Sequence, residues 1–340
     1  MAKTIEISKI KDQFQSYIQS GNLNFLLGSG ASLPAIRLAG NIEKEINELL
    51  EAEKTDDANL LALSFIEGLE EQHSTELEAE EKEKYIQTLE NYKSFMKVLD
   101  ELLFERKNHL LPRQANIFTT NYDLFTEIAA SELTSLVIND GFDRTSSISL
   151  DFRLALEQYH DRVYRSGTVY SRQIEVPVIN LFKVHGSLNW MKKNSDIVLK
   201  TGNAVRLTDK EKEKPEKVKE SLGERFLILP NIKKFSSTII DRIYYDMLRV
   251  YANSIEKENA VLISLGFSFE DEHILDITRR SLRNPTSQLI IFSHSADGVS
   301  RYEELFANQN NVLIVHPEGD DRIEFPEFNK QLKEIVPDRF

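Results

Sequence analysis

The sequence has no cysteine, and this absence removes several classes of chemistry at once. Without cysteine the chain cannot form disulfides, use a thiol nucleophile or build a cysteine-based zinc site. Basic residues are also outnumbered, because 42 lysines and arginines stand against 55 aspartates and glutamates, for a formal net charge of -13. This charge repels phosphate backbones, so we expect no broad nucleic-acid surface, while a single anionic nucleotide in a locally positive pocket is still allowed.

Long apolar runs are missing as well. No segment approaches about 18 uninterrupted apolar residues, and residues 1–20 lack the apolar stretch of a signal peptide. The expectation is therefore a cytoplasmic protein without a membrane partner. Apolar residues nevertheless make up 41% of the 340 residues, which suffices for one large α/β domain with insertions or for two smaller domains.

Short apolar strands alternate with helical segments along most of the chain. The pattern predicts strands at residues 24–27, 116–119, 178–184, 226–229, 261–265, 289–292 and 312–315. Apolar strands with glycine or polar tips, separated by helices, indicate a parallel sheet that helices cover on both faces. The predicted fold class is therefore α/β, a Rossmann-like parallel sheet with helices on both faces and a helical insertion.

Two charged stretches interrupt this alternation. Residues 41–109 carry apolar side chains at helical spacing among many charges, which predicts a helical insertion. Residues 191–223 are rich in lysine and glutamate and have few apolar residues, which predicts a polar excursion from the sheet. We therefore expect a single domain over residues 1–340, with its core built from residues 1–40, 110–190 and 224–340.

A glycine turn, Gly28-Ser29-Gly30-Ala31-Ser32, follows the first of these strands. Its glycines allow a tight turn and leave N–H groups uncovered, and the N-terminus of a following helix adds partial positive charge where a pyrophosphate could sit. The dinucleotide fingerprint is incomplete, because Leu33 stands where its third glycine would be. A glycine turn without a ligand, as in any open α/β sheet, is the alternative.

Polar residues at the ends of the other strands are the remaining candidates, because ligands bind beyond the carboxyl ends of such strands. Each also has an ordinary structural interpretation. Asn121 could cap the following helix, and Asp123 suits a first helical turn. His185 could bond to the backbone, and Asp271 could cap the helix after it. The residues alone leave both interpretations open.

The order of these motifs resembles the silent information regulator 2 (sirtuin) family. The resemblance lies in four motifs at successive strand ends: Gly28-Ser29-Gly30-Ala31-Ser32, Thr120-Asn121-Tyr122-Asp123, Lys183-Val184-His185-Gly186-Ser187 and Gly266-Phe267-Ser268. It is strongest with the prokaryotic sirtuin-like branch of anti-phage defence proteins, whose later segment reads as residues 266–274 do here. It covers most of the chain outside residues 41–109 and 191–223.

The resemblance implies that NAD+ is the substrate. The residues it implies for binding NAD+ are Gly28, Ser29, Gly30, Ala31, Ser32, Thr120, Gly266, Ser268, Asp271 and Ser293, with the pyrophosphate on the glycine turn. It places the nicotinamide ribose near Asn121, Asp123 and His185, the expected catalytic residues. This division suits the chemistry, because an amide can orient a water, a histidine can accept its proton, and a carboxylate can steady the developing cation.

The sequence departs from the pattern of sirtuin deacylases in two respects that bear on the reaction. Sirtuin deacylases usually carry four zinc-binding cysteines after the His-Gly motif, and the Asp-Phe-Arg that commonly follows their glycine turn is replaced here by Pro34-Ala35-Ile36-Arg37. We therefore expect an NAD+ glycohydrolase (NAD+ nucleosidase) that needs no metal and depletes NAD+ during phage infection. The alternatives are an NAD-dependent deacylase or ADP-ribosyltransferase, and a non-catalytic subunit that senses NAD+ or ADP-ribose.

An unrestrained NAD+ hydrolase would kill its host, so the activity needs a gate. The defence-family resemblance suggests a homo-oligomer, controlled by assembly or by a separately encoded HerA-like ATPase. The amphipathic helices expected within residues 41–109 offer an interface.

Overall fold

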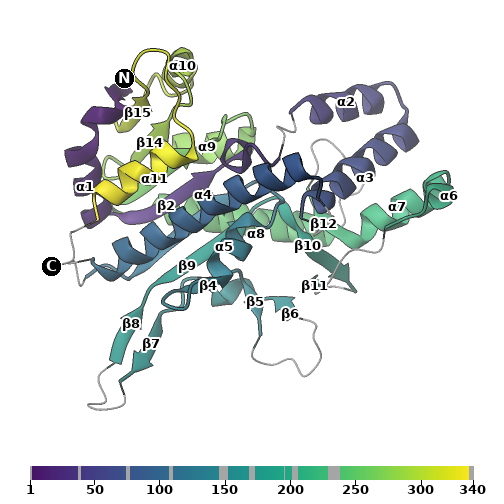
Figure 1. Cartoon of the computed structure of the whole chain (residues 1–340), viewed down its shortest axis with the longest axis horizontal. Coiled ribbons are helices and arrows are strands. Elements are labelled where there is room, and N and C mark those ends of the chain that lie inside the picture. Colours follow the sequence, from purple (N-terminus) through teal and green to yellow (C-terminus); the bar gives the residue numbers. More distant parts are fainter. Residues whose placement is uncertain are drawn as a thin grey trace.

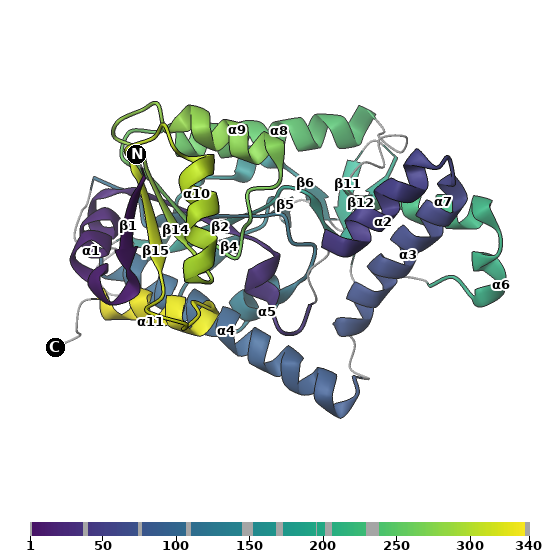
Figure 2. The ribbon, with the colours of Figure 1, turned by 90° about the horizontal axis from the view of Figure 1, so that it is seen from above.

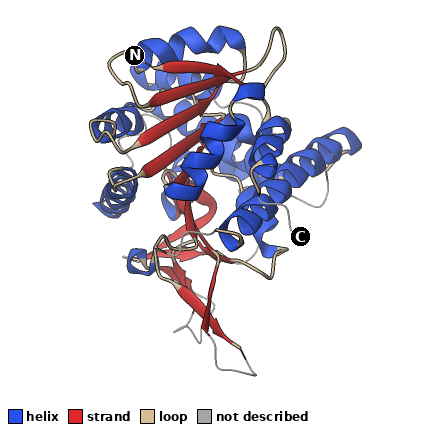
Figure 3. Cartoon of the chain, turned by 90° about the vertical axis from the view of Figure 1, so that its left-hand side faces the viewer, coloured by secondary structure: helices blue, strands red, loops and turns tan. Residues whose placement is uncertain are grey.

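A parallel sheet of eight strands forms the centre of the fold, in the order β1-β15-β14-β13-β2-β3-β9-β4. The computed structural model describes residues 2–36, 40–73, 77–106, 110–144, 152–167, 173–194, 196–200, 206–228 and 238–336. The strands of this sheet are β1 (Lys3–Glu6), β2 (Asn22–Leu27), β3 (Gln114–Thr119), β4 (Val137–Asn139), β9 (Val178–Lys183), β13 (Ala260–Leu265), β14 (Gln288–Phe292) and β15 (Val312–His316). All neighbouring strands pair in parallel, which confirms the predicted α/β fold (Figure 3).

Alternate side chains of the central strands enter two separate cores, as the two-residue period of a strand requires. In β2, Phe25 and Leu27 pack in one core, whereas Leu26 packs in the other. The first core is shared with α1 (Lys11–Ser20), α4 (Ala79–Phe104), α5 (Phe125–Ser131) and α11 (Phe325–Glu334). The second is shared with α8 (Thr238–Ile255), α9 (Glu272–Ser281) and α10 (Val299–Leu305). Figure 2 shows α8 and α9 on one side of the strands and α4 and α11 on the other.

Three helices, α2 (Gly40–Glu51), α3 (Thr55–Gln72) and α4, occupy the region of the predicted helical insertion. The long helix α4 covers the sheet, and its residues Phe95, Met96 and Leu99 are fully buried. By contrast, α2 and α3 extend past the sheet and have a small core of their own, made by Ile46, Ala58 and Ala62 (Figure 1). In the described parts of the chain, no helix combines the length and the apolar character that a membrane crossing demands.

A second sheet, antiparallel and of five strands, has the order β12-β10-β11-β6-β5. Its strands are β5 (Phe142–Asp143), β6 (Phe152–Leu154), β10 (Gly186–Lys193), β11 (Asp196–Leu199) and β12 (Arg225–Leu227). The strand expected at residues 226–229 therefore exists as β12, but it pairs antiparallel with β10 and lies outside the parallel sheet. Between β11 and β12 lie α6 (Asp209–Lys212) and α7 (Pro215–Glu224), and β7 (Val163–Ser166) pairs with β8 (Gln173–Val176) in a separate hairpin.

A row of three asparagines crosses the buried middle of the parallel sheet. Asn24, Asn116 and Asn180 stand opposite one another on β2, β3 and β9. The amide of Asn116 donates to Asn24 over 2.8 Å, and the amide of Asn180 donates to Asn116 over 2.9 Å. Backbone groups of Asn22 and His160 bond to the two ends of the row. The polar side chains are thus satisfied inside the sheet, where an unpaired amide would be costly.

Candidate active site

The strand ends that carry the four sequence motifs lie side by side. β13, β2, β3 and β9 are neighbours in this order and run in the same direction. One edge of the sheet therefore holds the tips at Gly266, Gly28, Thr120 and His185. This is the edge at which ligands bind in open α/β sheets, so the candidate site lies here.

The glycine turn after β2 packs directly against the turn after β13. The N–H of Gly30 donates to the carbonyl of Gly266 over 3.0 Å. A Cβ atom at Gly28 would lie 2.2 Å from the same carbonyl oxygen, so this position requires glycine because two backbones meet there. In the short 3-10 helix Ser29–Ser32, Ala31 and Ser32 are buried, and Ser29 is exposed. Ser29 is therefore the part of the turn that faces solvent.

A buried hydrogen-bonded cluster joins the glycine turn to the motif after β3. Ser32 donates its hydroxyl proton to Asp123 over 2.6 Å. The amide of Asn121 donates to the Ser32 hydroxyl over 3.0 Å and to the carbonyl of Gly28 over 2.9 Å. The hydroxyl of Tyr92 completes the cluster, 3.0 Å from that of Ser32. Because the Ser32 proton goes to Asp123, Tyr92 is the donor in this last bond.

These contacts bear on the ordinary interpretations of Asn121 and Asp123. The side chain of Asn121 does not cap α5, which has Leu124 at its N-cap, but holds the glycine turn. Asp123 does assist the start of α5, because its second oxygen accepts the N–H of Phe125 over 3.2 Å. Its carboxylate thus joins the helix start to Ser32.

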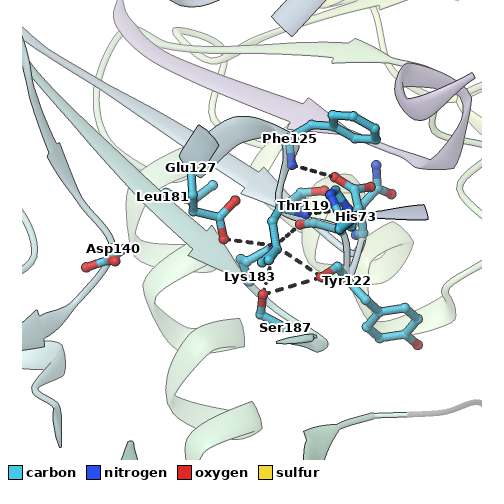
Figure 4. A network of polar contacts seen from close by, with 12 residues as sticks. His73, Thr119, Tyr122, Phe125, Glu127, Asp140, Leu181, Lys183 and Ser187 are labelled. Carbon is cyan, nitrogen blue, oxygen red and sulfur yellow. Dashed lines mark hydrogen bonds and ion pairs between the residues drawn. The ribbon is translucent and has the colours of Figure 1, made fainter. Parts of the chain in front are cut away.

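The buried ammonium of Lys183 holds the motif after β3 in place (Figure 4). It forms an ion pair with Glu127 and donates to the hydroxyl of Ser187, each over 3.0 Å. It also donates to the backbone carbonyls of Tyr122 and Asp123. The side chain of Lys183 is only 2% exposed. Burial raises the pKa of Glu127, although Lys183 pulls in the opposite direction. Lys183 therefore fixes the backbone that presents Asn121 and Asp123.

His185 and Asp271 form a second polar group at this edge. Nε2 of His185 lies 3.0 Å from Oδ2 of Asp271, and both side chains are largely buried. Asp271 also caps α9, as its ordinary interpretation predicts, by accepting the N–H of Ile274 over 3.0 Å. Burial alone would raise the pKa of Asp271, but the hydrogen bond and charge of His185, together with the Ile274 N–H, hold it below its usual value. The ring of Tyr244 on α8 packs 5.9 Å from the His185 ring.

The other expected residues stand apart from these two groups. Thr120 is partly exposed between β3 and Asn121. Ser268 is exposed after the Gly266 turn, and Ser293 is buried at the tip of β14, where it donates to the carbonyl of Ser295 over 2.8 Å. The structure therefore unites Ser32, Asn121 and Asp123 in one cluster, and His185 with Asp271 in another.

Two residues from the helices before β3 reach the site, and the sequence pattern does not single them out. Tyr92 of α4 sits at a helical core position, and only its bond to Ser32 links it to the site. His73, at the end of α3, accepts the N–H of Leu124 at Nε2 over 3.2 Å. Its other nitrogen is buried without a partner among the described residues. Burial lowers the pKa of His73 to about 4, so His73 stays neutral.

The depressed pKa of His73 predicts a loss of stability in mild acid. The ordinary pKa is 6.5, so the unfolded chain takes up a proton first as the pH falls. The contribution of neutral His73 to the free energy of unfolding is present above pH 6.5 and is lost progressively as the pH falls toward 4. Because of His73, the free energy of unfolding at pH 5.5 should be about 1 kcal/mol lower than at pH 7.5. Urea unfolding at pH 7.5 and pH 5.5 measures this difference.

A non-titrating variant isolates the effect of His73. His73→Gln keeps a hydrogen-bond acceptor but cannot be charged, so its stability should fall less between the two pH values. Ser131→Ala, at the exposed end of α5, serves as the control, because it changes no titrating group and should retain the wild-type pH dependence. An equal pH dependence in wild type and His73→Gln would show that His73 is not the titrating group.

The metal and family comparisons complete the description of the site. In the described residues, no group of three or more histidine, aspartate or glutamate side chains could hold a metal ion.

No curated protein matches the sequence. Residues 115–315, more than half of the chain, match the family model of the SIR2-like domain. The matched span contains Asn121, Asp123, His185 and Asp271, and it begins after the glycine turn. The chain belongs to the SIR2-like domain family.

Proposed function

We propose that the protein is an NAD+ glycohydrolase that cleaves the nicotinamide–ribose bond and depletes NAD+ in anti-phage defence. SIR2-like domains are NAD-utilising enzymes, and this family membership is the starting point. The observation that carries the proposal is the adjacency of the Asn121–Asp123–Ser32 cluster and the His185–Asp271 pair at the tips of neighbouring strands.

The proposed reaction breaks the bond between the anomeric carbon of the ribose and the nicotinamide nitrogen. Nicotinamide leaves as a neutral molecule with the electron pair of that bond, and positive charge develops on the ribose. The carboxyl group of Asp123, held by the Ser32 hydroxyl, stabilises this charge electrostatically. A water adds to the anomeric carbon and gives its proton to His185, while Asn121 orients the water and the ribose. The products are nicotinamide and ADP-ribose.

Product analysis tests the proposal. Purified protein is incubated with NAD+ in the presence of EDTA, because cleavage at the anomeric carbon needs no metal, and the products are separated by chromatography. Nicotinamide and ADP-ribose in equal amounts are expected. Acyl-ADP-ribose formed only with an acylated peptide would indicate a deacylase, and tight binding of NAD+ without any product would indicate a sensor. NAD+ measured in infected cells, with and without the protein, tests the defence role.

A further inference from the structure

We propose that Asp271 is a positioning residue that orients His185 and sets which imidazole nitrogen is free to accept a proton. This inference rests on the proposed function for its kinetic meaning. It differs from the role that the family resemblance implies, in which Asp271 contacts the nucleotide. The two roles predict different kinetic consequences, so they can be separated.

Both oxygens of the Asp271 carboxylate have protein donors. Oδ1 accepts the backbone N–H of Ile274, and Oδ2 lies 3.0 Å from Nε2 of His185. The side chain is 17% exposed, so water competes little for these bonds. The carboxylate is therefore directed at the histidine and the helix start.

The Asp271 carboxylate is held in position by residues of the hydrophobic core rather than by other residues of the site. Ile274, whose N–H binds Asp271, is fully buried in the core beneath α8 and α9. Phe269 precedes the cap in a left-handed conformation, with φ of 58°, and its ring is buried against Phe267 and Phe306. A left-handed backbone at a bulky residue persists only where packing holds it. Packing of the segment from Phe267 to Ile274 thus holds the Asp271 carboxylate in place beside His185.

The Asp271 carboxylate determines which nitrogen of the His185 imidazole carries the proton. The pKa of Asp271 lies below its usual value, so the carboxylate is ionised at neutral pH and can only accept hydrogen bonds. In the neutral form of the His185 imidazole, Nε2 then carries the proton that is donated to Asp271, and Nδ1 keeps the lone pair needed by a base. The described residues offer Nδ1 no hydrogen bond, and the centroid of the Tyr244 ring lies 5.9 Å from that of the imidazole. Once His185 takes a proton, the same carboxylate stabilises the imidazolium.

Asp271→Asn is the informative variant, because asparagine is as good an N-cap as aspartate and should keep α9 intact. An amide can donate to Nε2 and so favours the wrong tautomer. We expect kcat to fall by about 10-fold or more, with KM for NAD+ and the melting temperature near their wild-type values. Thr208→Ala, which removes a helix cap on α6, is the control and should leave kcat unchanged. A raised KM at unchanged kcat would make Asp271 a nucleotide ligand and overturn the proposal.

A double variant tests whether Asp271 acts through His185. In a His185→Ala background, Asp271→Asn should lower kcat no further, because the group that Asp271 orients is gone. Multiplied losses would contradict the proposal.

Nitrogen NMR of the histidine rings gives a readout that does not need activity. Wild type should show the His185 proton on Nε2, and Asp271→Asn should change that population; an unchanged tautomer would refute the proposal. If wild type releases no nicotinamide, the proposed function fails, and the NMR result alone decides the role of Asp271.

Discussion

Nicotinamide release from NAD+ should slow by about 100-fold or more in His185→Ala, the loss typical of a positioned acid-base group. His185 is the only proposed proton acceptor for the attacking water, and its loss also removes the hydrogen bond to Oδ2 of Asp271. The side chain lies at a strand tip and is 16% exposed, so the cores remain filled. The rate constant at saturating NAD+ is measured together with the melting temperature.

The control for this variant is His316→Ala. His316 ends β15, which is separated from β9 by four strands of the parallel sheet. Its replacement removes an imidazole at the same edge but away from the proposed reaction, so turnover should stay within about twofold of wild type, as for a surface change. If folded His185→Ala kept the wild-type rate, His185 would not be the base, and the assignment of the reaction to this site would fall.

Lys183→Met is expected to lower the free energy of unfolding by about 3–5 kcal/mol, the cost of breaking one partner of a buried ion pair. Methionine fills a similar space, but Glu127, only 20% exposed, then lacks its cation, and the carbonyls of Tyr122 and Asp123 lose a donor. Urea unfolding at pH 7.5 measures the loss. Lys183 also fixes the backbone that carries Asn121, so folded Lys183→Met should be less active than wild type.

Two comparisons establish that the effect of Lys183 comes from burial. Lys93 pairs with Glu90 and Glu132 on the surface, and Lys93→Met should cost about 1 kcal/mol or less. Adding Glu127→Gln to Lys183→Met removes the stranded charge and should recover part of the stability. A loss in Lys183→Met no larger than in Lys93→Met would mean that the buried pair contributes little.

The parallel sheet is predictable from sequence because its central strands are rich in apolar residues. Strands such as β2 and β13 are buried on both faces, so most of their residues are apolar. The misplaced strand, β12, shows the limit of this reasoning. Its three residues do not indicate which strand they pair with, and in the structure Leu227 stands opposite Gly186 of β10. The edge strands β1 and β4 escape prediction because they are short and only partly buried.

The residues of the candidate site also fall into those that the sequence predicts and those that it does not. Asn121, Asp123 and His185 could be selected because polar residues after apolar strands stand out in the sequence. Tyr92, His73 and Tyr244 could not, because they lie on or at the ends of helices, where their spacing suits the core. Only tertiary packing turns a hydroxyl or imidazole on such a helix toward the strand tips. Side chains that support a site from another element carry no local signal.

The asparagine row inside the sheet affects the register of the strands, and so the relative positions of the strand ends. Asn24, Asn116 and Asn180 each stand four residues before a motif position, at Gly28, Thr120 and Val184. Sliding one strand by two residues would keep its apolar side chains on the same faces, so hydrophobic packing penalises that error weakly. The slide would, however, separate buried amides that have no water to replace their partners, at about 1–3 kcal/mol for each unpaired group. The row therefore favours the register in which the ends of β2, β3 and β9 lie level, because a shifted strand would leave buried amides without partners.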